Sequence, residues 1–417
     1  MTDPLEIVDL THDGRGVGRS LDKGQGKTCF VQGALPGERV EWTLVKNHLK
    51  YDEGVVKSLL TSSPDRIEPK CRYFGECGGC QIQHLDYAAQ VRAKQQRLQR
   101  ALEHKNISVI NWLEPVTSNP WSYRRRARLS VDPNAGVIGF KPSSSKQTLG
   151  IESCSVLIPE LDQALPLLPD ILKSLPLKLQ GVVSEIKLSY ENRRLSVSLL
   201  VDRKIPPSTI EGVSIDLIDC DLWVKFKNAP AQLIYSSAKE GAALPPTGFI
   251  QANAEINSAL ITNAQRLLNL TEKDFLLDLF CGSGNFSTAL SSEAGEVVGI
   301  EVSREAVDRA NSLCGSASNL SHRCADLFDA KALSGLRSLF RRATAVLLDP
   351  PRAGAEAVVR ELVKSKPAQI LYISCHPATF IRDAEILVSK GYKLDSGGLL
   401  DMFPQTMHAE VIGLFRI

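Results

Sequence analysis

Glycine turns separate short runs of β-prone residues across the first 62 positions of the chain. The runs read EIVDLTHDGRGVGR, KTCFVQGALPGERVEWTLVKN and YDEGVVKSLLTSS. This rhythm predicts a small five-stranded β-barrel over residues 1–62. Such barrels often bind single-stranded nucleic acid, and a modest basic surface is available here, although a solvated charged face has the same pattern. Its residues are Lys46, His48, Lys50 and Lys57.

Residues 84–104, HLDYAAQVRAKQQRLQRALEH, have helical periodicity. Six positions recur at the spacing that puts them on one helix face, with Arg and Lys opposite: Leu85, Ala88, Val91, Gln95, Leu98 and Leu102. Residues 151–248 carry alternating apolar runs such as EIKLSYENRRLSVSLLVD, which predict an α+β middle domain.

The C-terminal third begins with a strand, a glycine turn and a helix in DFLLDLFCGSGNFSTALS, where Phe275 to Phe280 form the strand. A second strand, EVVGIEVS, ends at Glu301, 19 residues after Gly282. The order strand, glycine turn, helix and strand is typical of the start of a doubly wound parallel sheet. An acidic side chain at the end of the second strand, such as Glu301, can accept hydrogen bonds from a ribose diol. The loop reads G-S-G-N and holds no basic residue, which favours S-adenosylmethionine over a pyrophosphate ligand such as NAD.

Two further apolar strands end in polar residues. ATAVLLDPPRAG ends in Asp349, and AQILYISCHPATF ends in Cys375, just before a helix beginning near Pro377. Ligands of open parallel sheets bind beyond these carboxyl ends, so both residues are expected in a cleft. A cysteine ahead of a helix N-terminus is expected to favour its thiolate form. Glu410 lies next to a final strand, and a structural cysteine with an exposed glutamate remains the alternative.

Composition limits the number of domains, the class of protein and its cellular compartment. The 417 residues suggest two or three domains, and 43% hydrophobic with 23% charged residues is a globular balance. No run of eighteen apolar residues and no basic-then-apolar leader occurs, so we expect no membrane contact. Ten irregularly spaced cysteines favour a reducing cytoplasm over a disulfide scaffold, and a net charge of +2 says little about partners.

Three of those cysteines share one glycine-rich loop, CRYFGECGGC, with the spacing C-x5-C-x2-C. In a cytoplasmic protein, clustered thiols are more often metal or cluster ligands than bridges. A fourth ligand must come from elsewhere, and Cys154 lies in a polar turn before an apolar run, although six other cysteines remain candidates: Cys29, Cys220, Cys281, Cys314, Cys324 and Cys375. The residues alone leave zinc and iron–sulfur open, and also three unconnected structural cysteines.

The segment WSYRRRARLSVD sets four arginines beside two aromatic rings. Arginines contact phosphates and rings stack on bases, so we expect an RNA-contact strand here. The residues are Trp121, Tyr123, Arg124, Arg125, Arg126 and Arg128.

Taken in order, eight segments closely resemble the RNA uracil-5-methyltransferases, specifically the type that acts on 23S ribosomal RNA and carries an N-terminal TRAM barrel. They are DGRGVGR, CRYFGECGGCQIQH, YRRRARLS, GFIQANAEIN, DLFCGSGNFS, DPPRAG, YISCHPATF and DMFPQTMHAE, and they span nearly the whole chain. One departure is His376, which stands where the family usually has asparagine.

The resemblance implies the roles of individual residues. It implies a 4Fe-4S cluster on four cysteines: Cys71, Cys77, Cys80 and Cys154. It implies a methyl-donor site for S-adenosylmethionine: Gln251, Phe280, Asn285, Glu301, Asp326 and Asp349. It also implies that Cys375 is the nucleophile, which adds to uracil C6, and that Glu410 is the base.

The resulting expectation is a Rossmann-like class I methyltransferase with an OB-like TRAM barrel and an α+β central domain that carries the cluster. The domains are residues 1–62, 63–248 (central, RNA-binding) and 249–417 (catalytic), with 84–114 packed on the catalytic domain. The expected partner of the chain, itself a cytoplasmic monomer, is 23S ribosomal RNA.

Four other classes remain to be separated from this one. A transfer RNA uracil-5-methyltransferase shares the chemistry but typically lacks the barrel and the cysteine loop. A non-catalytic RNA-binding protein with a cluster or a zinc ribbon would need neither Cys375 nor Glu410. Radical S-adenosylmethionine enzymes use C-x3-C-x2-C, and cytosine-5 RNA methyltransferases rely on two cleft cysteines. Iron content and preference for uracil over cytosine distinguish these classes.

Overall fold

The computed structural model describes residues 3–19, 27–133, 135–142, 147–226, 229, 231–238, 250–315 and 318–417. The chain forms two compact units. The first comprises Met1–Ala93, Asn119–Ala243 and Phe403–Met407, and the second comprises Lys94–Ser118, Leu244–Met402 and His408–Ile417. The domain boundary predicted between residues 248 and 249 lies outside the described residues.

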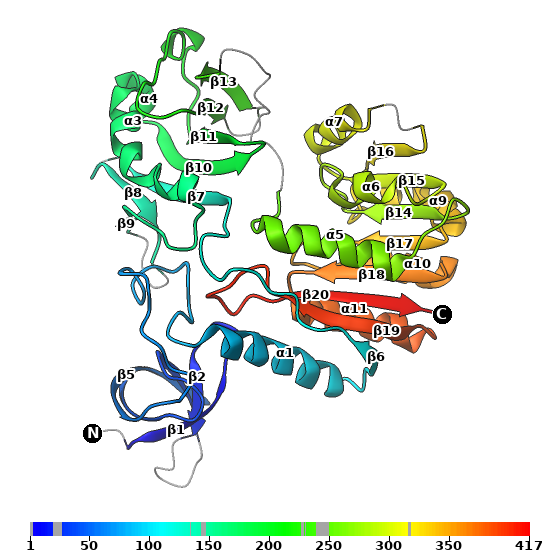
Figure 1. Cartoon of the computed structure of the whole chain (residues 1–417), viewed down its shortest axis with the longest axis horizontal. Helices are drawn as coiled ribbons and strands as arrows, with labels where there is room; N and C mark the ends of the chain where they lie inside the picture. Colours follow the sequence, from blue (N-terminus) through cyan, green and yellow to red (C-terminus); the bar gives the residue numbers. More distant parts are fainter. Residues whose placement is uncertain are drawn as a thin grey trace. The chain divides into compact units, whose positions relative to one another are not determined.

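The first unit begins with a closed five-stranded barrel, drawn in blue in Figure 1, which confirms the prediction for residues 1–62. Its strands are β1 (Leu5–Leu10), β2 (Gly16–Arg19), β3 (Thr28–Gln32), β4 (Arg39–Asn47) and β5 (Tyr51–Thr61). Alternate residues point inward, as in β1, where Leu5 and Ile7 are buried and Glu6 and Val8 are exposed. A small apolar core around Trp42 fills the barrel.

A seven-stranded sheet forms the rest of the first unit, in the order β13-β12-β11-β10-β7-β8-β9. Its strands are β7 (Arg126–Asp132), β8 (Val137–Phe140), β9 (Leu149–Gly150), β10 (Val183–Glu191), β11 (Arg194–Val201), β12 (Asp221–Phe226) and β13 (Ala231–Ser236). Short helices accompany it: α2 (Pro159–Asp162), η2 (Leu165–Leu167), α3 (Leu168–Ser174), α4 (Leu177–Gln180) and η3 (Pro207–Thr209). This is the expected α+β layout, and its sheet also includes β7, β8 and β9, which precede residue 151.

The second unit contains an eight-stranded sheet in the order β16-β15-β14-β17-β18-β20-β19-β6. Its strands are β6 (Val109–Trp112), β14 (Phe275–Leu279), β15 (Glu296–Glu301), β16 (Leu320–Cys324), β17 (Ala345–Leu348), β18 (Gln369–Ser374), β19 (Lys393–Leu400) and β20 (Glu410–Arg416). Strands β14 to β18 run parallel, and β20 is antiparallel to both of its neighbours. This is the doubly wound sheet that the sequence predicts.

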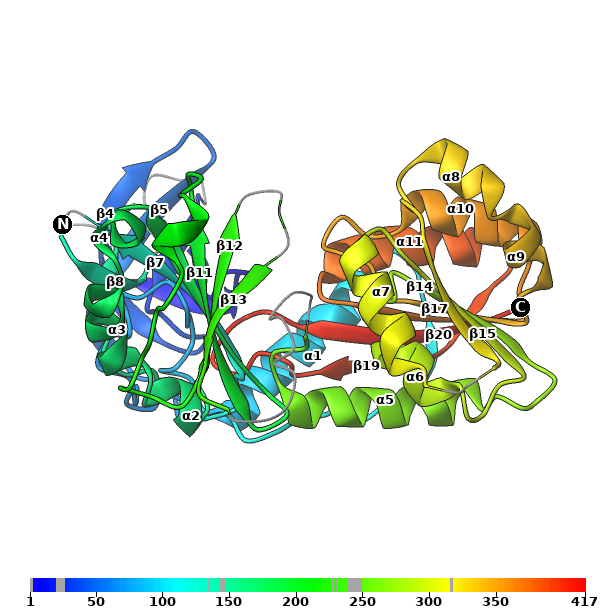
Figure 2. The same ribbon diagram turned by 90° about the horizontal axis from the view of Figure 1, so that it is seen from above.

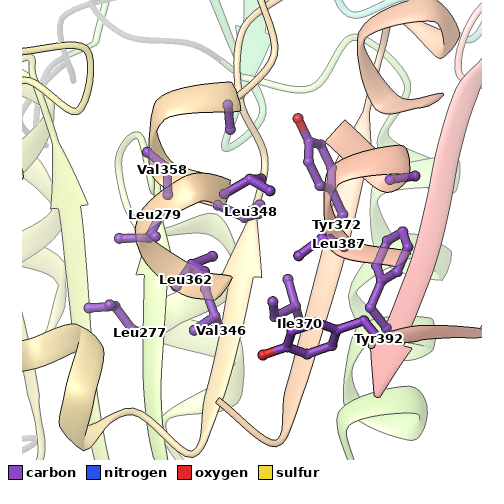
Figure 3. Close-up of a cluster of buried hydrophobic side chains, with 14 of the residues drawn as sticks. Leu277, Leu279, Val346, Leu348, Val358, Leu362, Ile370, Tyr372, Leu387 and Tyr392 are labelled. Carbon is purple, nitrogen blue, oxygen red and sulfur yellow. The ribbon is translucent and has the colours of Figure 1, made fainter. Parts of the chain in front are cut away.

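Helices cover both faces of this sheet (Figure 2). On one face lie α5 (Ala254–Leu268), α6 (Asn285–Leu290) and α7 (Arg304–Leu313). On the other lie α8 (Ala330–Gly335), α9 (Arg337–Arg342), α10 (Glu356–Ser365) and α11 (Pro377–Ser389). Figure 3 shows the apolar layer between the strands and α10 and α11, where Leu277, Val346 and Ile370 meet Leu362 and Leu387.

Helix α1 (Tyr87–Glu103) confirms the predicted helix but corrects its buried face. Leu98 and Leu102 are buried in the same apolar cluster as the sheet of the second unit, whereas Ala88 is exposed. Gln90 and Lys94 are buried instead, because each has a buried polar partner that pattern alone does not reveal. Among the described residues, no helix is long and apolar enough to cross a membrane.

Candidate active site

The carboxyl ends of the parallel strands bring the predicted residues of the second unit to one edge of its sheet. From β14 the chain moves outward to β15 and β16, and then returns to β17 on the other side of β14. Such a switch point opens a crevice beyond the strand ends, where ligands of this fold bind. Glu301 ends β15, Asp349 follows β17 and Cys375 follows β18.

The glycine loop after β14 is shaped by left-handed backbone. Phe280, Gly282 and Gly284 all have positive φ, at 64°, 57° and 86°. A side chain added at Gly282 would meet nothing within 4 Å, so space is open above the loop. Glu301 closes the loop from β15, because its carboxylate accepts hydrogen bonds from the Gly282 amide at 3.2 Å and the Ser303 amide at 2.9 Å.

The other predicted methyl-donor residues surround this loop. Asn285 opens α6 and exchanges hydrogen bonds of 3.0 Å with Asn257 on α5. Phe280 packs against Phe328, with ring centroids 5.6 Å apart. Asp326, in the exposed turn after β16, accepts a 2.8 Å hydrogen bond from the Phe328 amide.

Asp278 is a residue that the sequence reasoning missed. It lies inside β14, is fully buried, and accepts a 2.9 Å hydrogen bond from the Ser287 amide through Oδ2. Its Oδ1 is buried without a partner among the described residues. Burial raises the pKa of this carboxyl to about 7. An acidic residue in the apolar run FLLDLF was the available signal.

Cys375 and Glu410 come together through strand pairing. Ser374 of β18 pairs with Val411 of β20, and continuing this antiparallel register places Cys375 opposite Glu410. The glutamate is buried, with 3% of its surface exposed, so the alternative of an exposed glutamate is wrong. Gln251 is also buried and donates to Asp349 at 3.5 Å.

Electrostatics in this corner contradict the expectation of a thiolate at rest. Burial, followed by the charges of Glu410 and Asp349, raises the pKa of Cys375 to about 11. These effects outweigh the N-terminus of α11, so the thiol is protonated at neutral pH in the ligand-free protein. Burial and Asp349 likewise raise the pKa of Glu410 to about 8, and burial raises that of Asp349 to about 7. The carboxyl groups are therefore stronger bases than usual.

The first unit holds the four predicted cluster cysteines. All ten cysteines are free thiols. Cys80 is influenced electrostatically by Cys154, Cys77 and Cys71, so the four side chains are neighbours. Burial raises the pKa of Cys80 to about 12 and that of Cys154 to about 11.

No group of three or more His, Cys, Asp or Glu side chains in the described part of the chain is arranged to hold a metal ion. Four thiols are a donor set that zinc and an iron–sulfur cluster both accept.

The arginine segment is only partly available for RNA. Tyr123 is 7% exposed and donates a 3.1 Å hydrogen bond to the Pro404 carbonyl, so its ring does not offer a stacking surface. Arg128 is exposed and forms two hydrogen bonds with Glu185, at 2.7 and 2.6 Å. Burial, with repulsion from Arg124 and Arg125, lowers the pKa of Arg126 to about 10.

The fold and the site define a Rossmann-fold methyltransferase. The family model described as tRNA (Uracil-5-)-methyltransferase matches residues 242–416. The 23S rRNA (uracil(1939)-C(5))-methyltransferase RlmD of Marinomonas sp. (strain MWYL1) is 37% identical over 99% of this chain and 94% of its own. The enzyme of the same name from Thiobacillus denitrificans is 36% identical over 100% of both chains. The chain therefore belongs to the RlmD-type 23S rRNA uracil-C5 methyltransferase family.

A solved structure shares the complete fold. The Pyrococcus abyssi tRNA (uracil-54, C5)-methyltransferase, crystallised with S-adenosyl-L-homocysteine, covers 99% of this chain and 100% of its own, with a TM-score of 0.72 and 22% identity. The match covers nearly the whole of both chains. The fold alone does not separate the two RNA substrates.

Proposed function

We propose that this protein transfers a methyl group from S-adenosylmethionine to C5 of one uridine in 23S ribosomal RNA, the uridine that corresponds to position 1939 in the names of its relatives. The observation that carries the proposal is the full-length identity of 36–37% to enzymes of that name. A tRNA substrate is the second candidate, favoured by the fold match to the archaeal enzyme.

The donor would bind at the glycine loop. When bound, S-adenosylmethionine supplies an electrophilic methyl group. Glu301 is suited to accept hydrogen bonds from a ribose diol, because its carboxylate is already fixed by the Gly282 and Ser303 amides. Phe280, Asn285 and Asp326 would line the nucleoside end, and Gln251 with Asp349 the end nearer to Cys375.

Cys375 makes C5 of uracil reactive. Its thiol releases a proton to solvent, and the sulfur then forms a bond to C6 while the C5–C6 double bond opens toward an enolate. C5 thereby becomes nucleophilic enough to take the methyl group. The raised pKa of the free thiol means that substrate binding must help to ionise it, since the two buried carboxyl groups oppose the charge.

Glu410 would complete the reaction. Once C5 carries the methyl group, Glu410 removes the C5 proton, the C5–C6 double bond re-forms and the Cys375 sulfur leaves. A carboxylate whose pKa is raised is a stronger base than an exposed one, which suits this step. The target base must be turned out of its RNA fold to reach both groups.

We further propose that Cys71, Cys77, Cys80 and Cys154 hold a 4Fe-4S cluster, which would tie two distant segments of the first unit together and take no part in methyl transfer. RNA would be contacted by the barrel and by the arginine segment. The protein would act as a monomer in the cytoplasm.

The experiment that tests the function uses RNA with 5-fluorouridine at the target site. Fluorine cannot leave as a cation, so the methylated adduct should persist as a protein–RNA band on a denaturing gel. Cys375→Ala should abolish the band and turnover. Cys220→Ala, a change in the first unit, is the matched control and should keep both. A band that persists in Cys375→Ala would show that the nucleophile is wrong.

Glu410→Gln should separate the two halves of the reaction. Addition and methyl transfer proceed, but removal of the C5 proton is blocked, so ordinary uridine RNA should accumulate as a trapped adduct. Turnover at the parent rate would remove Glu410 from the scheme. Running 23S rRNA and tRNA fragments side by side decides the substrate: methylation of tRNA alone would favour the second candidate.

A further inference from the structure

One face of the central sheet in the first unit carries a continuous row of polar side chains. Strand pairing sets Arg128 of β7 beside Lys187 of β10, Lys187 beside Ser198 of β11, and Ser198 beside Trp223 of β12. Residues that pair directly across strands point to the same face and lie about 5 Å apart. Their sequence neighbours, such as Val197, belong to the apolar core on the opposite face.

Positive charge is concentrated along this row. Arg126 and Lys225 flank it, each two residues along a strand from a member of the row. Burial, followed by the charges of Arg128, Lys225 and Arg126, lowers the pKa of Lys187, and Glu185 is the acid that opposes them. Glu185 already pairs with Arg128 at 2.6 Å. Among the described residues, Glu185 thus acts on both Arg128 and Lys187, and an added anion would stabilise these two cations further.

Two buried donors in the row lack a partner. Ser198 is 3% exposed and Trp223 is 5% exposed. The Ser198 hydroxyl and the Trp223 Nε1–H have no hydrogen-bond partner within the described part of the chain. Burying a donor without a partner costs free energy, and folded proteins leave few such groups. Two of them side by side, next to the positive charges of Arg128 and Lys187, indicate a ligand with several acceptor oxygens.

We propose that this row is a binding site for a phosphate of the RNA backbone, in which Ser198 and Trp223 donate hydrogen bonds and Lys187 supplies charge. The proposal rests on the proposed function and adds a specific contact to it. RNA is favoured over an acidic peptide because β7, which contributes Arg128 to the row, begins at Arg126 within the arginine segment. The long stems of lysine and arginine let their charged ends rearrange around a phosphate.

Ser198→Ala gives the sharpest test, because it predicts opposite effects on stability and on binding. The hydroxyl has no partner in the free protein, so its removal should leave the melting temperature unchanged or raise it. Affinity for a 23S rRNA fragment that contains the target uridine should nevertheless fall about tenfold, since a hydrogen bond to a charged phosphate is lost. Trp223→Phe, which keeps a ring but removes the N–H, should also weaken binding.

Lysine variants distinguish a specific contact from a general loss of charge. Lys187→Met and Lys178→Met change the net charge equally, but Lys178 lies on α4, outside the row. Only Lys187→Met should lower the slope of log affinity against log salt, by about 0.7 for one contact to single-stranded RNA. At saturating RNA, both variants should methylate at the parent rate, because neither residue lies in the catalytic unit.

The outcomes separate this inference from the proposed function. If Ser198→Ala and Trp223→Phe bind RNA like the parent, the row is not a phosphate site. Equal salt slopes for the two lysine variants would mean that the row contributes only diffuse positive charge. If the variants lose binding to a polyglutamate peptide as much as they lose binding to RNA, the partner is an acidic protein instead. If the parent protein binds the RNA but does not methylate it, the proposed function fails. The comparisons of the variants still decide whether the row binds a phosphate.

Discussion

At the scale of single residues, Cys375 and Glu410 influence each other's ionisation. The two residues lie opposite each other because they adjoin the Ser374–Val411 pair of β18 and β20. After burial, the charge of Glu410 has the largest effect on the pKa of the thiol. A negative neighbour makes a thiolate harder to form. The carboxylate that is proposed to act late in the reaction would therefore oppose its first step.

This conflict predicts how Cys375 reacts in the absence of RNA. With its pKa near 11, its alkylation by iodoacetamide should rise about tenfold per pH unit from pH 8 to 10, as the thiolate fraction grows. Glu410→Gln removes a negative charge, so it should lower the thiol pKa and speed alkylation at pH 9 by about tenfold, equivalent to ~1.4 kcal/mol of repulsion. Mass spectrometry of the Cys375 peptide measures this rate.

The matched control is Glu385→Gln, a change on the exposed side of α11 that should leave the rate unaltered. Slower or unchanged alkylation in Glu410→Gln would mean that the glutamate does not oppose the thiolate.

At the scale of elements, α1 is fixed by buried polar contacts that are unusual for a helix rich in Lys and Arg. Gln90 donates to the Gln405 side chain at 2.9 Å, in the first unit. One turn later Lys94 donates to Asp401 at 2.6 Å, in the second unit, with both side chains fully buried. Asp401 directly follows β19, whose last residue, Leu400, pairs with Glu410. The ion pair thus holds the strand end beside Glu410.

Removing one partner of this buried pair should be costly. Lys94→Met leaves Asp401 charged and buried, which should lower the free energy of unfolding by about 3–5 kcal/mol, and adding Asp401→Leu should recover most of the loss. Urea midpoints measure these changes.

The control for this pair is Lys105→Met, which breaks an exposed ion pair with Glu385 and should cost no more than about 1 kcal/mol. If Lys94→Met is equally mild, the buried pair does not anchor the strand end.

At this scale, some features of the molecule could be predicted from the sequence and others could not. The glycine loop and Glu301 were predictable, because strand, turn and helix are contiguous in sequence. The burial of Lys94 was not, since a lysine in a helical pattern indicates solvent unless its partner, 307 residues away, is known. The raised thiol pKa of Cys375 depends in the same way on Glu410, which is distant in sequence. Non-local pairing also creates the row from Arg128 to Trp223, and no short motif records it.

At the scale of the whole molecule, the two kinds of proposed cofactor site belong to different compact units. The four cysteines lie in the first unit, and all six proposed methyl-donor residues lie in the second. A bound cluster stabilises only the fold that holds it, since its binding energy is folding energy for those segments. Loss of iron and loss of S-adenosylmethionine binding should therefore be separable.

Cys154→Ser should lose iron as fully as Cys77→Ser, although Cys154 is 74 residues beyond the loop of the other three ligands, measured from Cys80. Both variants should be colourless and should melt at a lower temperature, while their affinity for S-adenosylmethionine stays within about twofold of the parent, a difference of only ~0.4 kcal/mol. Iron assay, visible absorbance and calorimetric titration measure the three quantities.

Cys324→Ser, which changes a half-buried cysteine on β16, is the control, and this variant should keep its iron. Stoichiometric zinc in a colourless parent protein would replace the cluster with a zinc site. Retention of iron by Cys154→Ser would remove this residue from the ligand set, and loss of donor binding together with iron would show that the two units do not act independently.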